Sequence, residues 1–153
     1  MSRASEDLAE RLFERAGPLL ELLRSTDVST AQELIRRART ILNEMSEDDQ
    51  IAVINAHPRI GERPETVSAA SFREQGYDRD TTPPEVFLRL ASLNEEYEQK
   101  FGFRFVVFVN RRPKGALIPI LEARLRGSRA DELRTAVREI LAIAEDRAKH
   151  EES

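Results

Sequence analysis

Apolar residues recur every three or four positions along most of this chain, with polar residues between them. Side chains at this spacing share one face of an α-helix, so each stretch predicts a helix with one face in the protein core. The recurring positions are Leu8, Leu12, Phe13, Leu19 and Leu22 in the first segment, Leu34, Ala38, Ile41 and Leu42 in the second, Val86, Leu90, Leu93 and Tyr97 in the third, and Leu133, Val137, Ile140 and Ala144 in the last.

Four short motifs predict where helices begin. In a capping box, Ser or Thr and a polar residue three positions later satisfy backbone N–H groups at the start of a helix. Pro83, after Thr82, suits the first helical position. The motifs are Ser29-x-x-Gln32, Ser46-x-x-Asp49, Thr82-x-x-Glu85 and Ser128-x-x-Asp131. Together with the apolar spacing they predict an all-α fold, a single compact multi-helix domain over residues 1–153.

Residues 103–109, Phe-Arg-Phe-Val-Val-Phe-Val, break the helical spacing. Aromatic and β-branched residues favour a strand, but no other segment is a convincing partner for one. A lone strand cannot complete its backbone hydrogen bonds. We therefore expect a short buried connector, extended, irregular or helical, near residues 103–110, with backbone groups that can meet a ligand.

Composition narrows the possible classes of function. The chain has 153 residues, 40% hydrophobic and 34% charged, and no cysteine. This length and composition fit one soluble domain, and they exclude disulfides, thiolate chemistry and sulfur-ligated metals. The two histidines, His57 and His150, lack the spacing of metal ligands. We therefore expect no metal site.

Charge and hydropathy bear on partners and location. No apolar run approaches the ~20 residues of a membrane span, and the first residues lack a signal-peptide pattern, so we expect a cytoplasmic protein and no membrane partner. The net charge of -4 argues against nucleic-acid binding. Residues 41–100 hold 13 acidic and 6 basic residues, whereas residues 101–139 hold 9 basic and 4 acidic residues. The basic region either holds a small anion or is a solvated helix surface.

A histidine lies where a helix is expected to end, in Ala56-His57-Pro58-Arg59-Ile60-Gly61. Pro58 disfavours helical backbone at His57, and Gly61 permits a loop. An imidazole at such an exit can face a cavity, and it titrates nearer to neutral pH than other side chains. The alternative is a structural histidine that bonds a carbonyl of the last helical turn.

Three polar residues, Ser71, Glu74 and Gln75, share one face if residues 65–75 form a helix. They form either an exposed polar patch or part of a site, in which a carboxylate can orient an imidazole.

Arginine continues an otherwise apolar helix face where the seam of the last helix steps from Ala144 to Arg147. Its guanidinium either extends to solvent at the helix end or reaches a buried anion or carbonyl. We interpret four other cations, Arg111, Arg112, Lys114 and Arg124, as solvated charges.

Taken together, several motifs resemble the OHCU decarboxylase family, the 2-oxo-4-hydroxy-4-carboxy-5-ureidoimidazoline decarboxylases of urate breakdown. The resemblance covers residues 46–147 most strongly, and the order and spacing of the motifs make it specific. The motifs are Ala-His57-Pro58-x-Ile-Gly61, Ser71-x-x-Glu74-Gln75, Leu93-Asn94-x-x-Tyr97-x-x-Lys100-Phe-Gly-Phe-x-Phe105-Val106, Arg124-Leu125, Glu132-Leu and Glu139-Ile-x-x-Ile143-x-x-x-Arg147.

The resemblance implies an all-helical fold, a homodimer and no cofactor. It implies that His57 and Glu74 are catalytic and that a small ureidoimidazoline is the substrate. The substrate-binding residues that it implies are Pro58, Ser71, Gln75, Val107, Phe108, Val109, Asn110, Arg111 and Arg147.

The implied reaction removes CO2 from OHCU and protonates one face of the intermediate to give (S)-allantoin. We expect His57 to move the substrate hydroxyl proton or protonate the intermediate, with Glu74 orienting it, while free N–H groups of residues 107–111 complete the site. Two alternatives remain at this point. One is a repurposed homologue that acts on another carboxylated ureido ring, and the other is a non-catalytic helical interaction module.

Overall fold

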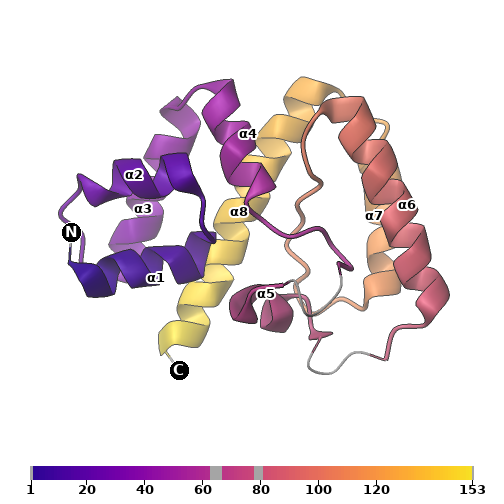
Figure 1. The fold of residues 1–153 in the computed structure, drawn as a ribbon, viewed down its shortest axis with the longest axis horizontal. Coiled ribbons are helices and arrows are strands. Elements are labelled where there is room, and N and C mark those ends of the chain that lie inside the picture. The colour runs from indigo at the N-terminus through magenta and orange to yellow at the C-terminus, as the bar shows by residue number, and fades with distance from the viewer. Residues whose placement is uncertain (1, 63–66, 78–80, 153) are drawn as a thin grey trace. The chain divides into compact units, whose positions relative to one another are not determined.

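The computed structural model describes residues 2–62, 67–77 and 81–152, and no strand occurs in these ranges. The all-α prediction is therefore confirmed for them. Figure 1 shows the helices, which are α1 Arg3–Phe13, α2 Gly17–Arg24, α3 Ala31–Glu44, α4 Glu47–Asn55, α5 Ala69–Glu74, α6 Pro84–Phe101, α7 Lys114–Arg124 and α8 Arg129–Glu152.

The chain divides into two compact units. The first unit comprises Met1–His57 and Val137–Ser153, and the second comprises Pro58–Ala136. Helix α8 contributes residues 129–136 to the second unit and its remainder to the first. That the whole chain acts as one domain stays a prediction.

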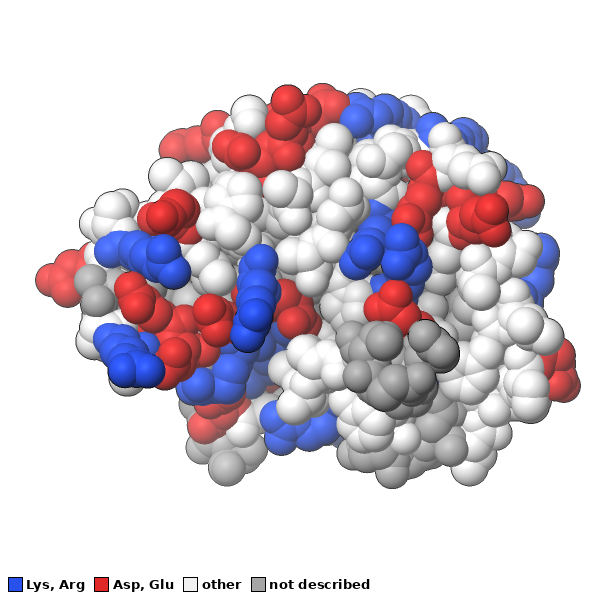
Figure 2. Space-filling model, viewed as in Figure 1, with Lys and Arg blue, Asp and Glu red and all other residues white. Residues whose placement is uncertain are grey.

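In the first unit, α2 packs against α1, α3 and α4. The apolar spacing explains these contacts, because most of the recurring residues of α1, α2 and α3 are buried; examples are Leu12, Leu19 and Leu34. Arg39 of α3 pairs with Glu145 of α8 at 2.8 Å on the surface. Figure 2 shows acidic and basic side chains interspersed over the N-terminal helices, as expected for solvated helix faces.

The first apolar segment is two helices, whereas its continuous spacing predicts one. Helix α1 ends at Phe13 because Glu14 has φ 60° and ψ -162°, a backbone conformation that no helix contains. Helix α2 begins at Gly17 with Pro18 in its first turn. Leu22 of α2, which the spacing places on the buried face, is 46% exposed.

Two of the four predicted helix starts are confirmed. The Ser46 side chain accepts from the Asp49 N–H at 3.2 Å, and Ser128 accepts from Asp131 at 3.2 Å. The other two are wrong by one residue. Thr30 rather than Ser29 caps α3 and accepts from the Glu33 N–H at 3.2 Å.

The start of α6 is shifted because two prolines follow one another. Pro84 forces Pro83 into extended backbone, with φ -62° and ψ 147°. Pro83 is therefore the cap, and Pro84 is the first helical residue.

The second unit is built around α6 and α7, which pack against each other. Helix α6 ends at Phe101 and is capped by Gly102, whose φ of 82° suits a residue without a side chain. Just beyond it, Phe103 and Phe105 pack edge-on against Tyr97, with ring centroids 6.0 and 5.4 Å away. These aromatic contacts fix the start of the connector.

The predicted connector is confirmed. Residues 103–109 are neither helix nor strand. Phe103, Phe105, Val106, Val107 and Val109 are all buried. Buried backbone polar groups need partners, and here side chains supply several of them.

Among the helices of the described ranges, none is long and apolar enough to cross a membrane.

Candidate active site

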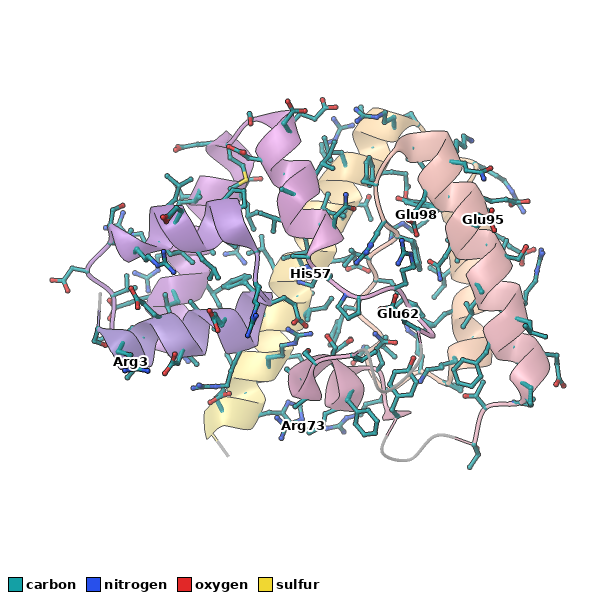
Figure 3. The ribbon with its side chains drawn as sticks, viewed as in Figure 1. Arg3, His57, Glu62, Arg73, Glu95 and Glu98 are labelled. Carbon is teal, nitrogen blue, oxygen red and sulfur yellow. The ribbon has the colours of Figure 1, made fainter. Side chains whose placement is uncertain are left out.

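Histidine 57 directly follows helix α4 and belongs to the first unit (Figure 3). Its N–H donates to the Ile54 carbonyl at 3.1 Å, and its Nδ1 lies 3.1 Å from the Val53 carbonyl. The ring is 3% exposed. His57 therefore makes the contact with the last helical turn that the sequence left open as an alternative. This contact determines the tautomer of the ring.

The contact with Val53 assigns the tautomer of His57. A carbonyl oxygen only accepts hydrogen bonds, so Nδ1 carries the proton and Nε2 is the basic nitrogen. Burial and, to a smaller extent, the positive charge of Arg147 lower the pKa of His57 to about 4, although Glu14 and the Val53 carbonyl oppose the shift. At neutral pH the imidazole is uncharged and can accept a proton at Nε2.

Arginine 147 lies on α8 in the same unit and is also buried. Its Nη1 donates to the carbonyls of Arg11 and Leu12 at 3.3 and 3.4 Å, and its Nη2 donates to Glu14 Oε1 at 3.0 Å. Of the two alternatives for this residue, the structure shows the second, a guanidinium that reaches buried acceptors. The carbonyls belong to the last turn of α1, which a cation stabilises.

In the second unit, α5 carries the polar group that the spacing predicts. Ser68 caps this helix by accepting from the Ser71 N–H at 3.1 Å, and Gln75 is its last, capping residue. Ser71 and Gln75 are buried, so the exposed-patch alternative is wrong for them. Of the expected helix over residues 65–75, positions 65 and 66 lie outside the described residues.

Two contacts of this polar group join it to other segments of the unit. Glu74 Oε1 accepts from the Val109 N–H at 2.8 Å, and Gln75 Oε1 accepts from the Gly61 N–H at 3.2 Å. Glu74 thus holds the connector, and Gln75 holds the loop that follows Pro58. The expectation of free N–H groups at 107–111 is wrong for Val109, because a buried amide takes a nearby carboxylate as its partner.

Three of the four cations interpreted as solvated are bonded to backbone carbonyls. Lys114 is 3% exposed, donates to the Gln75 carbonyl at 2.9 Å and lies 3.9 Å from the centre of the Tyr77 ring. Arg112 donates to the Val109 carbonyl at 3.0 Å. Arg124 donates to the Val106 carbonyl at 2.6 Å. Arg111 is exposed, as predicted.

Arg124 belongs to a buried network. It also donates to Glu132 Oε1 at 2.7 Å, and the Tyr97 hydroxyl donates to the same oxygen at 2.7 Å. Burial and the bond to Glu132 raise the pKa of Tyr97, so its hydroxyl stays protonated and remains a donor. The network joins residues of α6, α7 and α8, and Arg124 holds the connector at Val106.

The remaining predicted site residues lie at or beside the connector. Val107 is buried and Phe108 is half-buried. Asn110 and Arg111 are exposed and have φ of 51° and 62°, so the chain turns sharply there. Pro58 is half-buried at the start of the second unit.

A sequence model of the OHCU decarboxylase family matches residues 2–149. The chain belongs to the OHCU decarboxylase family. An OHCU decarboxylase of Haloferax volcanii is 30% identical over 140 residues, which are 91% of this chain and 83% of that protein. An OHCU decarboxylase of Halalkalicoccus jeotgali is 31% identical over 103 residues, 67% of this chain, and this match spans 58% of that protein's length.

A solved structure has the same fold. The crystal structure of an OHCU decarboxylase in the presence of (S)-allantoin is 26% identical, with a TM-score of 0.73. The match covers 92% of this chain and 94% of that one. The fold expected for a member of the OHCU decarboxylase family is thus present in this chain.

In this OHCU decarboxylase family member, Glu14 is a buried charged group that the sequence pattern did not indicate. It bonds Arg147 and shifts the pKa of His57. Lys114 was also missed, because a cation beside Arg111 and Arg112 is typical of a solvated cluster. For both, the contacts join residues more than 30 positions apart, and spacing carries no such signal.

A pocket of about 560 Å³ lies in the second unit, beside the loop that Gln75 holds at Gly61. Arg59, Glu62, Asn94, Glu95 and Glu98 are among its lining residues, and Figure 3 labels its three glutamates. Arg59 pairs with Glu98 at 2.7 Å and with Glu62 at 3.2 Å, so its charge is already balanced. Among the described residues, no cluster of three or more His, Asp and Glu side chains could hold a metal ion.

Proposed function

We propose that this protein decarboxylates 2-oxo-4-hydroxy-4-carboxy-5-ureidoimidazoline to (S)-allantoin and CO2 in urate degradation, without a cofactor. The observation that carries the proposal is a buried, uncharged histidine with an assigned tautomer, located in the Ala-His-Pro motif of a chain that matches this family over nearly its whole length. The matched family and its relatives are named for decarboxylation of this compound, and this supports the assignment of the substrate.

The chemistry needs a base and a polar frame. As the carbon–carbon bond to the carboxylate breaks, its electron pair passes into the ureidoimidazoline ring, CO2 leaves, and a proton is then added to one face of the carbon. A protein speeds such a step by positioning the substrate, stabilising the developing charge and controlling the proton. No step of this sequence requires an electron donor or acceptor outside the substrate.

His57 is the proposed proton-transfer group. Nε2 is basic in the assigned tautomer, so it can take the proton of the substrate hydroxyl and return a proton to the carbanion-like carbon. A base must be unprotonated to act, and a pKa of about 4 keeps it so throughout the neutral range. Activity is then present above this pKa and is lost as the pH falls through it.

The remaining residues supply the polar frame. We assign Arg147 to the substrate carboxylate or ureido carbonyl, and Ser71 and Gln75 to ring or carboxylate oxygens. Glu74 orients the reacting groups. Pro58 and the backbone of residues 107–111, apart from the Val109 N–H that Glu74 holds, complete the substrate contacts. Two of these residues have defined positions. Glu74 accepts a bond from the Val109 N–H, and the Gln75 carbonyl accepts a bond from Lys114.

We further propose that the protein is a cytoplasmic homodimer that binds neither nucleic acid nor membrane. Light scattering coupled to size-exclusion chromatography measures the mass directly, and a value of one chain, 17.5 kDa, would contradict the dimer.

Fractionation of source cells tests the compartment, and recovery of the protein with the membrane fraction would contradict the cytoplasmic assignment.

The function is tested with substrate made in solution. OHCU is generated enzymatically from urate, the purified protein is added, and the loss of OHCU and the circular dichroism of allantoin are followed. We expect rapid decay with formation of the S enantiomer alone. Decay at the spontaneous rate, with racemic allantoin, would contradict the proposed activity and favour an altered substrate or an interaction module.

A further inference from the structure

Glu14 combines two features that are rarely found together. Its backbone has φ 60° and ψ -162°, a region that is essentially restricted to glycine, and its side chain is only 11% exposed. Strained backbone at a non-glycine residue persists only where surrounding contacts impose it, and it clusters at functional sites. One contact that holds Glu14 here is its ion pair with Arg147 at 3.0 Å.

Arg147 is held independently of this ion pair. Its Nη1 bonds to the Arg11 and Leu12 carbonyls, which belong to the backbone of α1. These bonds remain if the Glu14 carboxylate moves away. The guanidinium therefore keeps its place while the carboxylate opposite Nη2 is exchanged for another one.

The proposed substrate carries such a carboxylate. A guanidinium binds carboxylates through paired N–H donors and does not distinguish one attached to the protein from one attached to a ligand. We propose that Glu14 is an internal counter-ion that occupies Arg147 in the ligand-free enzyme and is displaced by the substrate carboxylate. This inference rests on the proposed function, since it takes Arg147 as the residue that binds the substrate anion.

Charge balance around His57 favours an exchange over simple addition. Arg147 lowers the pKa of His57 and Glu14 raises it, so the imidazole responds to both charges. When one carboxylate replaces another at Arg147, the net charge beside His57 is unchanged. The imidazole then stays uncharged and basic in the complex, as proton transfer requires.

The exchange also makes binding depend on the stage of the reaction. (S)-Allantoin has lost the carboxylate as CO2, so it cannot compete with Glu14 for Arg147. Glu14 returns to the guanidinium and favours release of the product. The ion pair thus selects carboxylated ureido compounds over neutral ones.

The inference is tested by calorimetric titration with N-carbamoylglycine, an unreactive compound with one ureido group and one carboxylate. In Glu14→Gln the competitor is lost and the buried guanidinium lacks a carboxylate, so we expect Kd to fall about tenfold or more, which corresponds to ~1.4 kcal/mol. Glu10→Gln is the matched control, because Glu10 lies exposed on α1, the helix that Glu14 follows. Its Kd should stay within about twofold of the wild-type value.

Two further variants keep the test decisive. Glu14→Gly removes the carboxylate and suits the positive φ, so it replaces Glu14→Gln if that variant does not fold. In Glu14→Gln combined with Arg147→Gln, the gain in affinity should vanish. Unchanged or weaker binding in Glu14→Gln, or a gain that survives without Arg147, would overturn the inference. Turnover of OHCU by the wild-type protein is measured separately, so a failure of the proposed activity is distinguishable from a failure of this exchange.

Discussion

The two units hold their polar groups by different means. In the first unit, His57 and Arg147 bond to carbonyls at the ends of helices, and the charges of Arg147 and Glu14 shift the pKa of His57. In the second unit, Arg124, Arg112 and Lys114 bond to backbone carbonyls and thereby fix a connector and a helix end. The first unit therefore controls protons and charge, while the second supplies a rigid polar backbone.

This difference teaches where substitutions should act. Changes in the first unit should alter pH dependence and ligand affinity, because the charges of Arg147 and Glu14 act on His57. Changes in the second unit should alter stability and the order of the connector, since its cations act on the backbone. Each of the following experiments can break or sharpen this division.

The largest effect on stability is expected from Arg124→Met. Arg124 and Glu132 form a buried pair, with side chains 11% and 6% exposed. The substitution leaves the Glu132 carboxylate buried without its guanidinium and should destabilise the fold by about 3–5 kcal/mol in urea unfolding. Arg126→Met, at an exposed position close by, should change stability by less than about 0.5 kcal/mol. A loss of stability no larger than that of Arg126→Met would show that Arg124 does not stabilise this part of the fold.

The next effect is the pH dependence of stability that His57 produces. In the unfolded chain His57 has an ordinary pKa of about 6.5, whereas in the folded chain the pKa is about 4. Between these values the unfolded state binds the additional proton, so this group lowers stability as the pH falls from 6.5 toward 4 and has no effect above 6.5.

Unfolding by urea at a series of pH values measures this contribution. The slope over this range should be smaller in His57→Asn than in the wild type. The same change at the exposed His150 is the matched control and should leave the slope unchanged. Equal slopes in all three proteins would show that His57 titrates normally in the folded state.

A smaller loss is expected from Lys114→Met, which removes the bond to the Gln75 carbonyl. A hydrogen bond from a charged group contributes about 1.5–3 kcal/mol, and the apolar chain of Met keeps the packing against Tyr77. Amide hydrogen exchange should show faster exchange at the end of α5 and at Val109, since Glu74 bonds that amide. Exchange that stays at the wild-type rate would show that Lys114 does not fix this helix end.

The smallest effect concerns the corrected start of α3. Thr30 caps this helix, so Thr30→Ala should cost about 1 kcal/mol of unfolding free energy. Ser29→Ala, one residue earlier, should have almost no effect. If thermal or urea unfolding instead shows the larger loss for Ser29→Ala, then Ser29 caps the helix, as the capping-box pattern predicts.

The fold could be predicted to a large extent because it rests on local rules. Apolar spacing predicts the buried faces of the helices, and Ser46 and Ser128 mark two helix starts that the structure confirms. The connector was predicted because it lacks a partner strand. The break at Glu14 could not be predicted, since a glycine-like backbone at a glutamate carries no sequence mark.

The candidate site was less accessible to prediction from spacing. His57 and α5 stand out as local features, while their proposed roles rest on the family. Arg124, Lys114 and Glu14 were missed or misassigned because their partners lie 18 to 133 residues away along the chain. Long-range contacts of charged residues depend on how helices pack, and that information is not contained in the local pattern.

The most direct test of the account is the turnover of urate-derived OHCU by the wild type and by His57→Asn, which keeps a hydrogen-bond donor for the Val53 carbonyl. A general acid–base group contributes about 10²–10⁴-fold to the rate. We expect kcat to fall by at least about 100-fold at pH 7 while the helical circular dichroism is unchanged. A folded variant with wild-type turnover would contradict the assignment of His57 as the proton-transfer group.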